Sequence, residues 1–308
     1  MPSCPYIYCR SPLDEDGSDC AVCGHPQSEA ELMSPSFLAQ ADVEGLPDSI
    51  LDMHQILPSH KGMLEVQLLA MQKFRIERAL LQSAPDQAHS LFGNARLLEL
   101  VEQRPETFWI SQFIDPRMPN ALSNLEDVAA KGARVVKLLP PAGFRLDDPA
   151  HDPFLSRMEE MGLVAMVHTG FITARHKDEE AKAGAFMSSV YANPLTLDMP
   201  ARKFPRLTII LCHLGGAIWH EEGAQMVTQH DNVWGDVSGF GLFALQRLLR
   251  TRAAVDWSKV FWGNDSVPFA YPLNLRLLLA SLRQAGAEAL LPSLLFENGR
   301  DFAAAFLP

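Results

Sequence analysis

The chain has 308 residues, 47% of them hydrophobic, so it can bury one large core and fits a single α/β domain of this size. Acidic residues outnumber basic ones by 37 to 26, and the formal net charge of −11 disfavours nucleic acid and anionic membranes as partners. We find no apolar run that could span a membrane and no secretory leader at Met1, and therefore expect a cytoplasmic protein.

Four of the five cysteines lie in the first 23 residues, with the spacing Cys4-x4-Cys9-x10-Cys20-x2-Cys23. The Cys-x-x-Cys-Gly turn lets backbone amides point at thiolate sulfurs, as in zinc knuckles. We therefore predict a structural Zn²⁺ held by the four thiolates. Two disulfides or free thiols are the alternative, which a reducing cytosol disfavours. The spacing resembles short zinc-ribbon and Ran-binding-type fingers, and the acidic residues within it favour a contact with protein over nucleic acid.

Three regions follow one another along the chain. Residues 1–25 form the zinc-finger-like segment, and residues 26–48 resemble a connector because they lack periodicity. From 49 to 308, apolar runs alternate with amphipathic stretches, which predicts a (β/α)8 TIM barrel, an α/β fold. Strands are expected near 49–56, 76–83, 107–114, 133–139, 163–169, 207–213, 232–238 and 258–265. Helices are expected at 63–73, 91–104, 121–131, 152–161, 195–203, 219–229, 241–252, 272–285 and 293–306.

Four of the expected strands end in a metal-binding or proton-transfer side chain, namely His54, His168, His213 and Asp265. A (β/α)8 barrel places its active site at the carboxyl ends of its strands. We therefore expect these side chains to meet at one metal-assisted site, which makes an enzyme the first hypothesis.

Two basic residues are candidates for binding a substrate carboxylate. Lys137 lies at the end of the fourth strand, and Arg175 lies in the long aperiodic segment 170–194 that follows the fifth. Loops of this length on the active-site face often cover substrate. Cys212 is expected to point away from the barrel interior, because it alternates with His213.

The segment 204–216, which ends in Cys-His213-Leu-Gly-Gly, resembles the sixth-strand motif of the metal-dependent amidohydrolase-2 family. That family includes aminocarboxymuconate-semialdehyde decarboxylase and related hydrolases and decarboxylases. The resemblance continues in family order through 52–54, 113–116, 132–140, 162–170, 232–238, 263–265 and 298–300. It implies that His54, His168 and Asp265 hold Zn²⁺ or another divalent ion, and that His213 is the acid/base acting on a metal-activated water.

One position departs from the family pattern. The first strand of the family usually reads Asp-x-His-x-His, and the second histidine is here Ile56. In a regular strand Asp52, His54 and Ile56 share one face, so Ile56 should face the barrel mouth with His54. Three protein ligands plus water still make a catalytic zinc site, and His213 is near enough to be recruited as a fourth. The loss argues against a second ion bridged by a carboxylated Lys137.

Three functions remain open from the sequence. The first is a hydrolase of a C–O or C–N bond in a small carboxylate-bearing substrate, with His213 and Asp265 as catalytic residues. The second is a non-oxidative decarboxylase of the same family. The third is a non-catalytic barrel that serves as a binding subunit, suggested by Ile56. The expected partners are an anionic small molecule and, through the N-terminal segment, a second copy of the chain or another protein.

Overall fold

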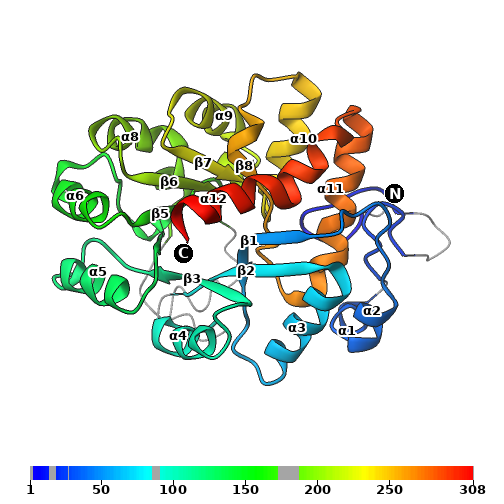
Figure 1. Ribbon diagram of the computed structural model, residues 1–308. Coiled ribbons are helices and arrows are strands. Elements are labelled where there is room, and N and C mark those ends of the chain that lie inside the picture. Colours follow the sequence, from blue (N-terminus) through cyan, green and yellow to red (C-terminus); the bar gives the residue numbers. More distant parts are fainter. Residues whose placement is uncertain (1–2, 14–18, 27, 85–90, 173–186, 308) are drawn as a thin grey trace.

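Eight parallel strands, paired in sequence order, form one sheet in this computed structural model, which describes residues 3–13, 19–26, 28–84, 91–172 and 187–307 (Figure 1). The strands are β1 (Ile50–Ile56), β2 (Ile76–Gln82), β3 (Phe108–Phe113), β4 (Val135–Leu138), β5 (Val164–His168), β6 (Thr208–Cys212), β7 (Val233–Asp236) and β8 (Val260–Phe261). Backbone hydrogen bonds from Met53 N to Trp262 O and from Asp265 N to His54 O join the two edges of the sheet. The predicted TIM barrel is confirmed as a nearly closed barrel.

Helices alternate with the strands around the outside of the barrel (Figure 1). They are α3 (Met63–Phe74), α4 (Asn94–Glu102), α5 (Ala121–Ala130), α6 (Asp152–Glu160), α8 (Asp198–Lys203), α9 (His220–Gln229), α10 (Gly241–Thr251) and α11 (Tyr271–Ala285). A last helix, α12 (Asn298–Phe306), follows a π-helical turn at Ser293–Glu297 where the sequence predicts one continuous helix. Phe302 of α12 packs on Phe261 in the barrel interior, so α12 covers the end at which the strands begin. The carboxyl ends of the strands face the opposite side.

Strand β8 is much shorter than the predicted 258–265. Only Val260 and Phe261 pair with β7, because Trp262 bonds elsewhere: its N–H donates to Leu294 O in the π-helical turn, and its carbonyl accepts from Met53 N of β1. The early end of β8 frees Asp265 from the ladder and lets it adopt a left-handed backbone.

The connector at 26–48 contains two short helices that its lack of periodicity did not predict, α1 (Glu29–Leu32) and α2 (Pro35–Gln40). Ser28 and Ser34 cap them by accepting hydrogen bonds from Glu31 N and Phe37 N. Serine before a helix start, with glutamate three residues later or proline next, is the signal that identifies such short helices in a sequence.

The cysteine-rich segment packs on the barrel beside α11 (Figure 1). Cys4, Tyr6, Tyr8, Cys20 and Cys23 are buried and share the hydrophobic core of the barrel and its helices. Its nearest protein contact is therefore the barrel of its own chain.

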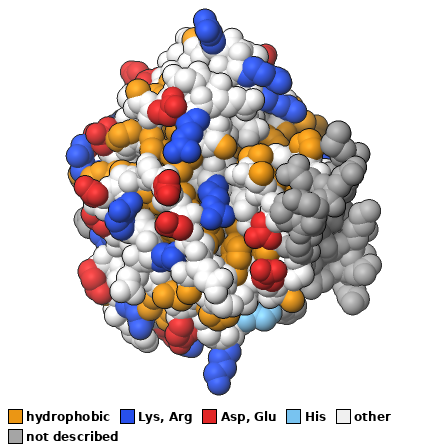
Figure 2. Space-filling model, turned by 90° about the vertical axis from the view of Figure 1, so that its right-hand side faces the viewer, with side chains coloured by type: hydrophobic (Ala, Val, Ile, Leu, Met, Phe, Trp, Pro, Cys, Tyr) orange, Lys and Arg blue, Asp and Glu red, His pale blue; other side chains and the backbone are white. Residues whose placement is uncertain are grey.

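Charges of both signs are mixed on the part of the surface that Figure 2 draws. Basic and acidic side chains are interspersed there rather than gathered into a field of one sign. Every helix in the described part of the chain is too short or too polar to cross a bilayer.

Candidate active site at the carboxyl end of the barrel

A bulge in β1 decides which of its side chains enter the barrel. The pairing with β2 shifts register between Asp52 and Gln55, so the alternation of faces is interrupted. Met53 packs in the interior, and His54, the next residue, is buried there as well. Asp52 instead accepts a hydrogen bond from Tyr271 Oη of α11, at 2.5 Å. The expectation that Asp52 and His54 share a face is therefore wrong.

His54 is held by the end of β7. Its Nδ1 lies 2.9 Å from Asp236 Oδ2 and 2.9 Å from Ser238 Oγ, which leaves Nε2 toward the barrel axis. A metal-binding histidine typically donates its other ring N–H to a carboxylate in this way. Burial and Lys137 lower the pKa of His54, but the Asp236 and Asp265 carboxylates outweigh them and raise it well above its usual value. From the sequence we assign Asp236 no role, although its place at the end of a predicted strand is a usable signal.

His213 and Asp265 both have left-handed backbone, with φ of 63° and 41°. Such angles are uncommon without glycine and turn both side chains toward His54. Asp265 Oδ1 lies 3.4 Å from His54 Nε2, and Asp265 Oδ2 lies 3.7 Å from His213 Nε2. The His213 ring is oriented by Ser238, whose carbonyl oxygen is 3.1 Å from Nδ1. The ligand atoms of His54, His213 and Asp265 lie within 4.8 Å of one another.

His168 joins the cluster from β5. Its ring centroid is 4.9 Å from that of His213, and its Nε2 is buried without a hydrogen-bond partner among the described residues. Burial, together with the charges of His213 and Lys137, lowers the pKa of His168 well below its usual value, so the ring is neutral. A buried polar atom without a partner costs free energy, which a cation bound to its lone pair offsets. These residues therefore fit a divalent metal ion.

Lys137 enters the same space from β4. Its Nζ lies 3.4 Å from His54 Nε2 and 3.0 Å from Cys212 Sγ, and the residue is only 6% exposed. Cys212 pairs in register with His168 and belongs to the interior cluster, so the expectation that it points outward is wrong. The physical reason lies at His213, which follows the strand end and reaches the barrel through its left-handed backbone rather than by alternation.

Ile56 is half-buried at the end of β1, where it pairs in register with Gln82 of β2. Gln82 Nε2 donates to Asp265 Oδ1 over 2.9 Å. At the level where the family pattern has its second histidine, this amide orients the aspartate. Gln82 was not singled out from the sequence because glutamine in a strand is not in itself a catalytic signal.

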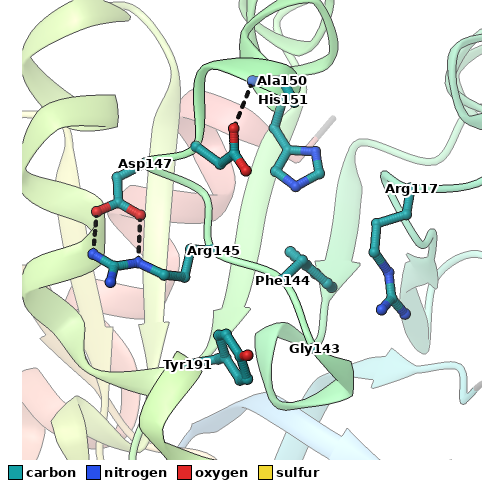
Figure 3. A pocket seen from close by; sticks show the side chains of 9 residues that line it. Arg117, Gly143, Phe144, Arg145, Asp147, Ala150, His151 and Tyr191 are labelled. Carbon is teal, nitrogen blue, oxygen red and sulfur yellow. Dashed lines mark hydrogen bonds and ion pairs between the residues drawn. The ribbon is translucent and has the colours of Figure 1, made fainter.

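The sequence predicts two residues, Lys137 and Arg175, that bind a substrate carboxylate, and the structure describes the position of one of them. Lys137 lies in the cluster, whereas Arg175 lies outside the described residues. A pocket of about 530 Å³ opens at the same end of the barrel, between the loops after β3, β4 and β5 (Figure 3). It is lined by Arg117, Gly143, Phe144, Arg145, Asp147, Asp148, Ala150, His151 and Tyr191. Its two arginines are already paired, Arg117 with Asp115 and Arg145 with Asp147.

The four N-terminal cysteines converge as their spacing predicts. All four sulfurs lie within 4.8 Å of one another, with Cys4 and Cys23 3.7 Å apart and Cys9 and Cys20 3.8 Å apart. A disulfide bond is about 2.05 Å long, so these separations exclude disulfides. Four sulfurs at about 2.3 Å from a tetrahedral Zn²⁺ would be about 3.8 Å apart. The geometry therefore fits a tetrathiolate metal site.

Backbone amides point at three of these sulfurs. Cys4, Cys9 and Cys23 each accept from the amide two residues further along, at Tyr6, Ser11 and His25. A hydrogen bond from the Cys23 thiol, opposed by burial, lowers the pKa of Cys9 to about 5. Burial raises the pKa of Cys4 to about 12.

An eight-stranded parallel barrel with three histidines and an aspartate at its carboxyl end is the architecture of a metal-dependent barrel enzyme. The model of the Amidohydrolase family (Amidohydro_2) matches residues 50–298. The chain belongs to this family of hydrolases and decarboxylases, and it is an enzyme. No curated protein sequence matches it significantly.

Solved structures share the fold at low identity. An uncharacterized TIM-barrel protein from Bordetella bronchiseptica is 16% identical with a TM-score of 0.63, over 83% of this chain and 98% of that one. The 2,6-dihydroxybenzoate decarboxylase from Rhizobium is 15% identical with a TM-score of 0.58, over 84% and 99%. A probable 2-pyrone-4,6-dicarboxylic acid hydrolase from Acinetobacter baumannii is 14% identical with a TM-score of 0.56, over 82% and 98%. These similarities establish the fold and leave the reaction open.

Proposed function

We propose that the protein is a metal-dependent hydrolase that cleaves a C–O or C–N bond in a small substrate carrying a carboxylate. The observation that carries this proposal is the meeting of four metal-binding side chains from four strand ends, one of which, His168, has a buried Nε2 without a partner among the described residues. The names of two similar structures, which refer to a dihydroxybenzoate and a pyrone dicarboxylate, support a carboxylate-bearing substrate.

In this proposal His54, His168 and Asp265 hold Zn²⁺ or another divalent ion. Such an ion supplies a Lewis acid that makes a water molecule more acidic and polarises the bond to be cleaved. Asp236 holds His54 and Gln82 holds Asp265, so two of the three ligands have fixed orientations.

His213 and Asp265 move the protons. Burial lowers the pKa of His213, although Asp265 and Asp236 oppose it, so the ring is a neutral base. Ser238 occupies its Nδ1, and Nε2 is the nitrogen that faces Asp265. The pair accepts the proton that the attacking water loses and returns a proton to the leaving group when the C–O or C–N bond breaks.

Lys137 binds the substrate carboxylate, and we assign the same role to Arg175. The Lys137 ammonium is buried beside His54, where water competes weakly with an ion pair. A cation on His54 Nε2 would repel this ammonium, and an anionic substrate between the two charges would relieve the repulsion.

Decarboxylation is the second candidate function, and the position of Lys137 favours it. A carboxylate that leaves as CO₂ is replaced by a proton on the same carbon, and the Lys137 ammonium next to the cluster is a proton donor placed to supply it. The product decides between the two reactions, because only decarboxylation yields a product with one carboxylate fewer.

The four cysteines hold a structural Zn²⁺ in this proposal, on the support of the sulfur separations. Zinc-bound thiolates, in place of disulfides, are typical of a reducing compartment, and we therefore keep the cytoplasm as the proposed location. A homodimer or a protein partner bound through the N-terminal segment stays a prediction that light scattering tests.

The test combines metal analysis with a substrate panel on the full chain. The panel contains lactones, esters and amides with a carboxylate, together with aromatic acids such as 2,6-dihydroxybenzoate. We expect His213→Ala to lower kcat by about 10² to 10⁴ with the barrel metal retained. The control is His60→Ala, which removes an exposed histidine. Loss of the barrel metal in His213→Ala would reassign His213 as a ligand, and a wild-type barrel without metal would refute the proposal.

A further inference from the structure

Tyr8, from the cysteine-rich segment, reaches the barrel cluster. A Cβ placed on Gly239, in the loop after β7, would lie 3.0 Å from Asp265 Oδ2, 3.4 Å from Tyr8 Oη and 3.6 Å from His213 Nδ1. A carboxylate, a phenol and an imidazole therefore converge on one point above this glycine. Tyr8 is only 9% exposed, so its hydroxyl belongs to the interior of the site.

The position of this hydroxyl is fixed by aromatic packing and by the fold around Cys4, Cys9, Cys20 and Cys23, which we call the cysteine knuckle. The Tyr8 ring meets Phe240 edge to face, with centroids 5.1 Å apart, and meets Tyr6 in the same way at 5.4 Å. Cys9, the next residue, donates its backbone N–H to Tyr6 O over 2.9 Å, which closes a turn around Tyr8. The ring therefore has little freedom as long as the knuckle is folded.

Hydrogen bonds tie the knuckle to the strand end that carries Asp265. Tyr6 Oη donates to Asn274 Oδ1 of α11 over 2.6 Å, and Asn274 Nδ2 donates to Asn264 Oδ1 over 2.8 Å. Asn264 immediately precedes Asp265 in the chain. The segment is thus built into the wall of the site.

A second contact docks the other half of the segment. Gly24 has a φ of 71°, and a Cβ there would lie 1.7 Å from Arg276 Nη1 of α11. Glycine suits this position, because its left-handed backbone strains other residues and a side chain here would displace the arginine. The turn that contains Tyr6 and the turn that contains Gly24 therefore both contact α11.

We propose that Tyr8 is a substrate-contacting residue of the barrel site, whose hydroxyl donates a hydrogen bond to an anionic oxygen of the substrate. The cysteine cluster then serves the active site by holding this hydroxyl beside Asp265 and His213. A phenol suits the place, because it donates a hydrogen bond without the positive charge that would repel a cation. This inference rests on the proposed hydrolase function and assigns it a residue from outside the barrel.

The test uses the full-length, zinc-loaded protein and two variants that remove the same atom from neighbouring tyrosines. Tyr8→Phe deletes the hydroxyl at the site, and Tyr6→Phe deletes one that binds the barrel wall. Calorimetric titration with 2,6-dihydroxybenzoate and with citrate measures the Kd for each, and metal analysis runs in parallel. For Tyr8→Phe we expect a Kd about tenfold higher or more with unchanged metal content, since a hydrogen bond to a charged group is lost. For Tyr6→Phe we expect a lower Tm and a Kd that rises much less than for Tyr8→Phe.

Equal Kd values for Tyr8→Phe and wild type would overturn this inference and leave the proposed function intact. A wild type that binds neither probe and hydrolyses or decarboxylates no panel compound would overturn both, because no substrate oxygen would then reach Tyr8. With an active substrate, the change should appear in KM more than in kcat, a split that a purely structural tyrosine does not produce.

A double variant tests the link to the cysteines. Cys9→Ser should weaken probe binding at least as much as Tyr8→Phe does, and Tyr8→Phe should add nothing in the Cys9→Ser background. Additive losses would show that the cluster does not act through Tyr8.

Discussion

The two polar clusters of this protein are assembled in different ways. The cysteine cluster takes four ligands of one kind from a segment of about twenty residues, and its sulfurs lie 3.7 and 3.8 Å apart in pairs. The barrel cluster collects histidines and an aspartate from four strand ends spread over more than two hundred residues of chain, with Lys137 among them. The first resembles a closed structural site and the second a catalytic site that leaves a position for substrate.

The difference indicates that the cysteine cluster stabilises the fold, whereas the barrel cluster is suited to catalysis. Four sulfurs fill the coordination sphere of a tetrahedral ion and leave it no reactive position. In the barrel, polar partners such as Asp236 and Gln82 orient the side chains that we propose as ligands, while Lys137 and His168 keep atoms directed at the shared space. Variants in one cluster should therefore have different effects from variants in the other.

Asp265→Ala should have the largest effect. It removes a metal ligand and a proton acceptor together, so kcat/KM should fall by at least about 10³-fold and the barrel ion should be lost. Elemental analysis should show about one ion per chain left, held by the cysteines. Asp301→Ala, which removes an exposed carboxylate on α12 at the opposite end of the barrel, is the control. If Asp265→Ala retained two ions per chain, Asp265 would not be a ligand of the barrel ion, and the proposed ligand set would be wrong.

Cys23→Ser should affect the cysteine cluster and leave the barrel cluster unchanged. Cys23 is fully buried, and its loss should release the cysteine ion while the barrel ion stays. Because metal binding is coupled to folding of the segment, the free energy of unfolding should fall by about 3 kcal/mol or more. Chemical denaturation and limited proteolysis near residue 26 measure it. A variant as stable and protease-resistant as wild type would mean that barrel packing alone holds the segment.

Lys137→Met should change two affinities in opposite directions. Removing the ammonium near His54 Nε2 should strengthen barrel metal binding about tenfold, because a like charge disappears, and weaken binding of an anionic probe by a similar factor. The protein is first loaded with zinc at the four cysteines. Titration with Zn²⁺ then gives the affinity of the barrel for metal, and titration with citrate gives its affinity for an anion. Weaker metal binding instead would indicate that Lys137 is itself part of the ligand set.

Much of this arrangement was predictable from the sequence, and the failures have local causes. Strand periodicity placed His54, His168, His213 and Asp265 at one end of the barrel because parallel strands share a direction. It failed for Cys212 and Asp52, since one bulge or one left-handed residue reverses the face that alternation assigns. Such irregularities depend on packing between strands.

Residues that act through others were the hardest to identify. Asp236 and Gln82 matter because of the side chains that they hold, His54 and Asp265, and these pairs form only when distant strands meet. Tyr8 is the extreme case, since its role depends on where a separate segment docks. The cysteine spacing, by contrast, carried its geometry within one short stretch of chain.

A crystal structure of the zinc-loaded protein with anomalous scattering measured at the zinc edge tests the central claim most directly. We predict two zinc ions per chain. One should lie among the four cysteine sulfurs at about 2.3 Å, and the other should bind His54, His168 and Asp265 at about 2.0–2.2 Å. A barrel without an ion, with Lys137 Nζ still between His54 and Cys212, would contradict the proposal that this barrel is a metal-dependent hydrolase.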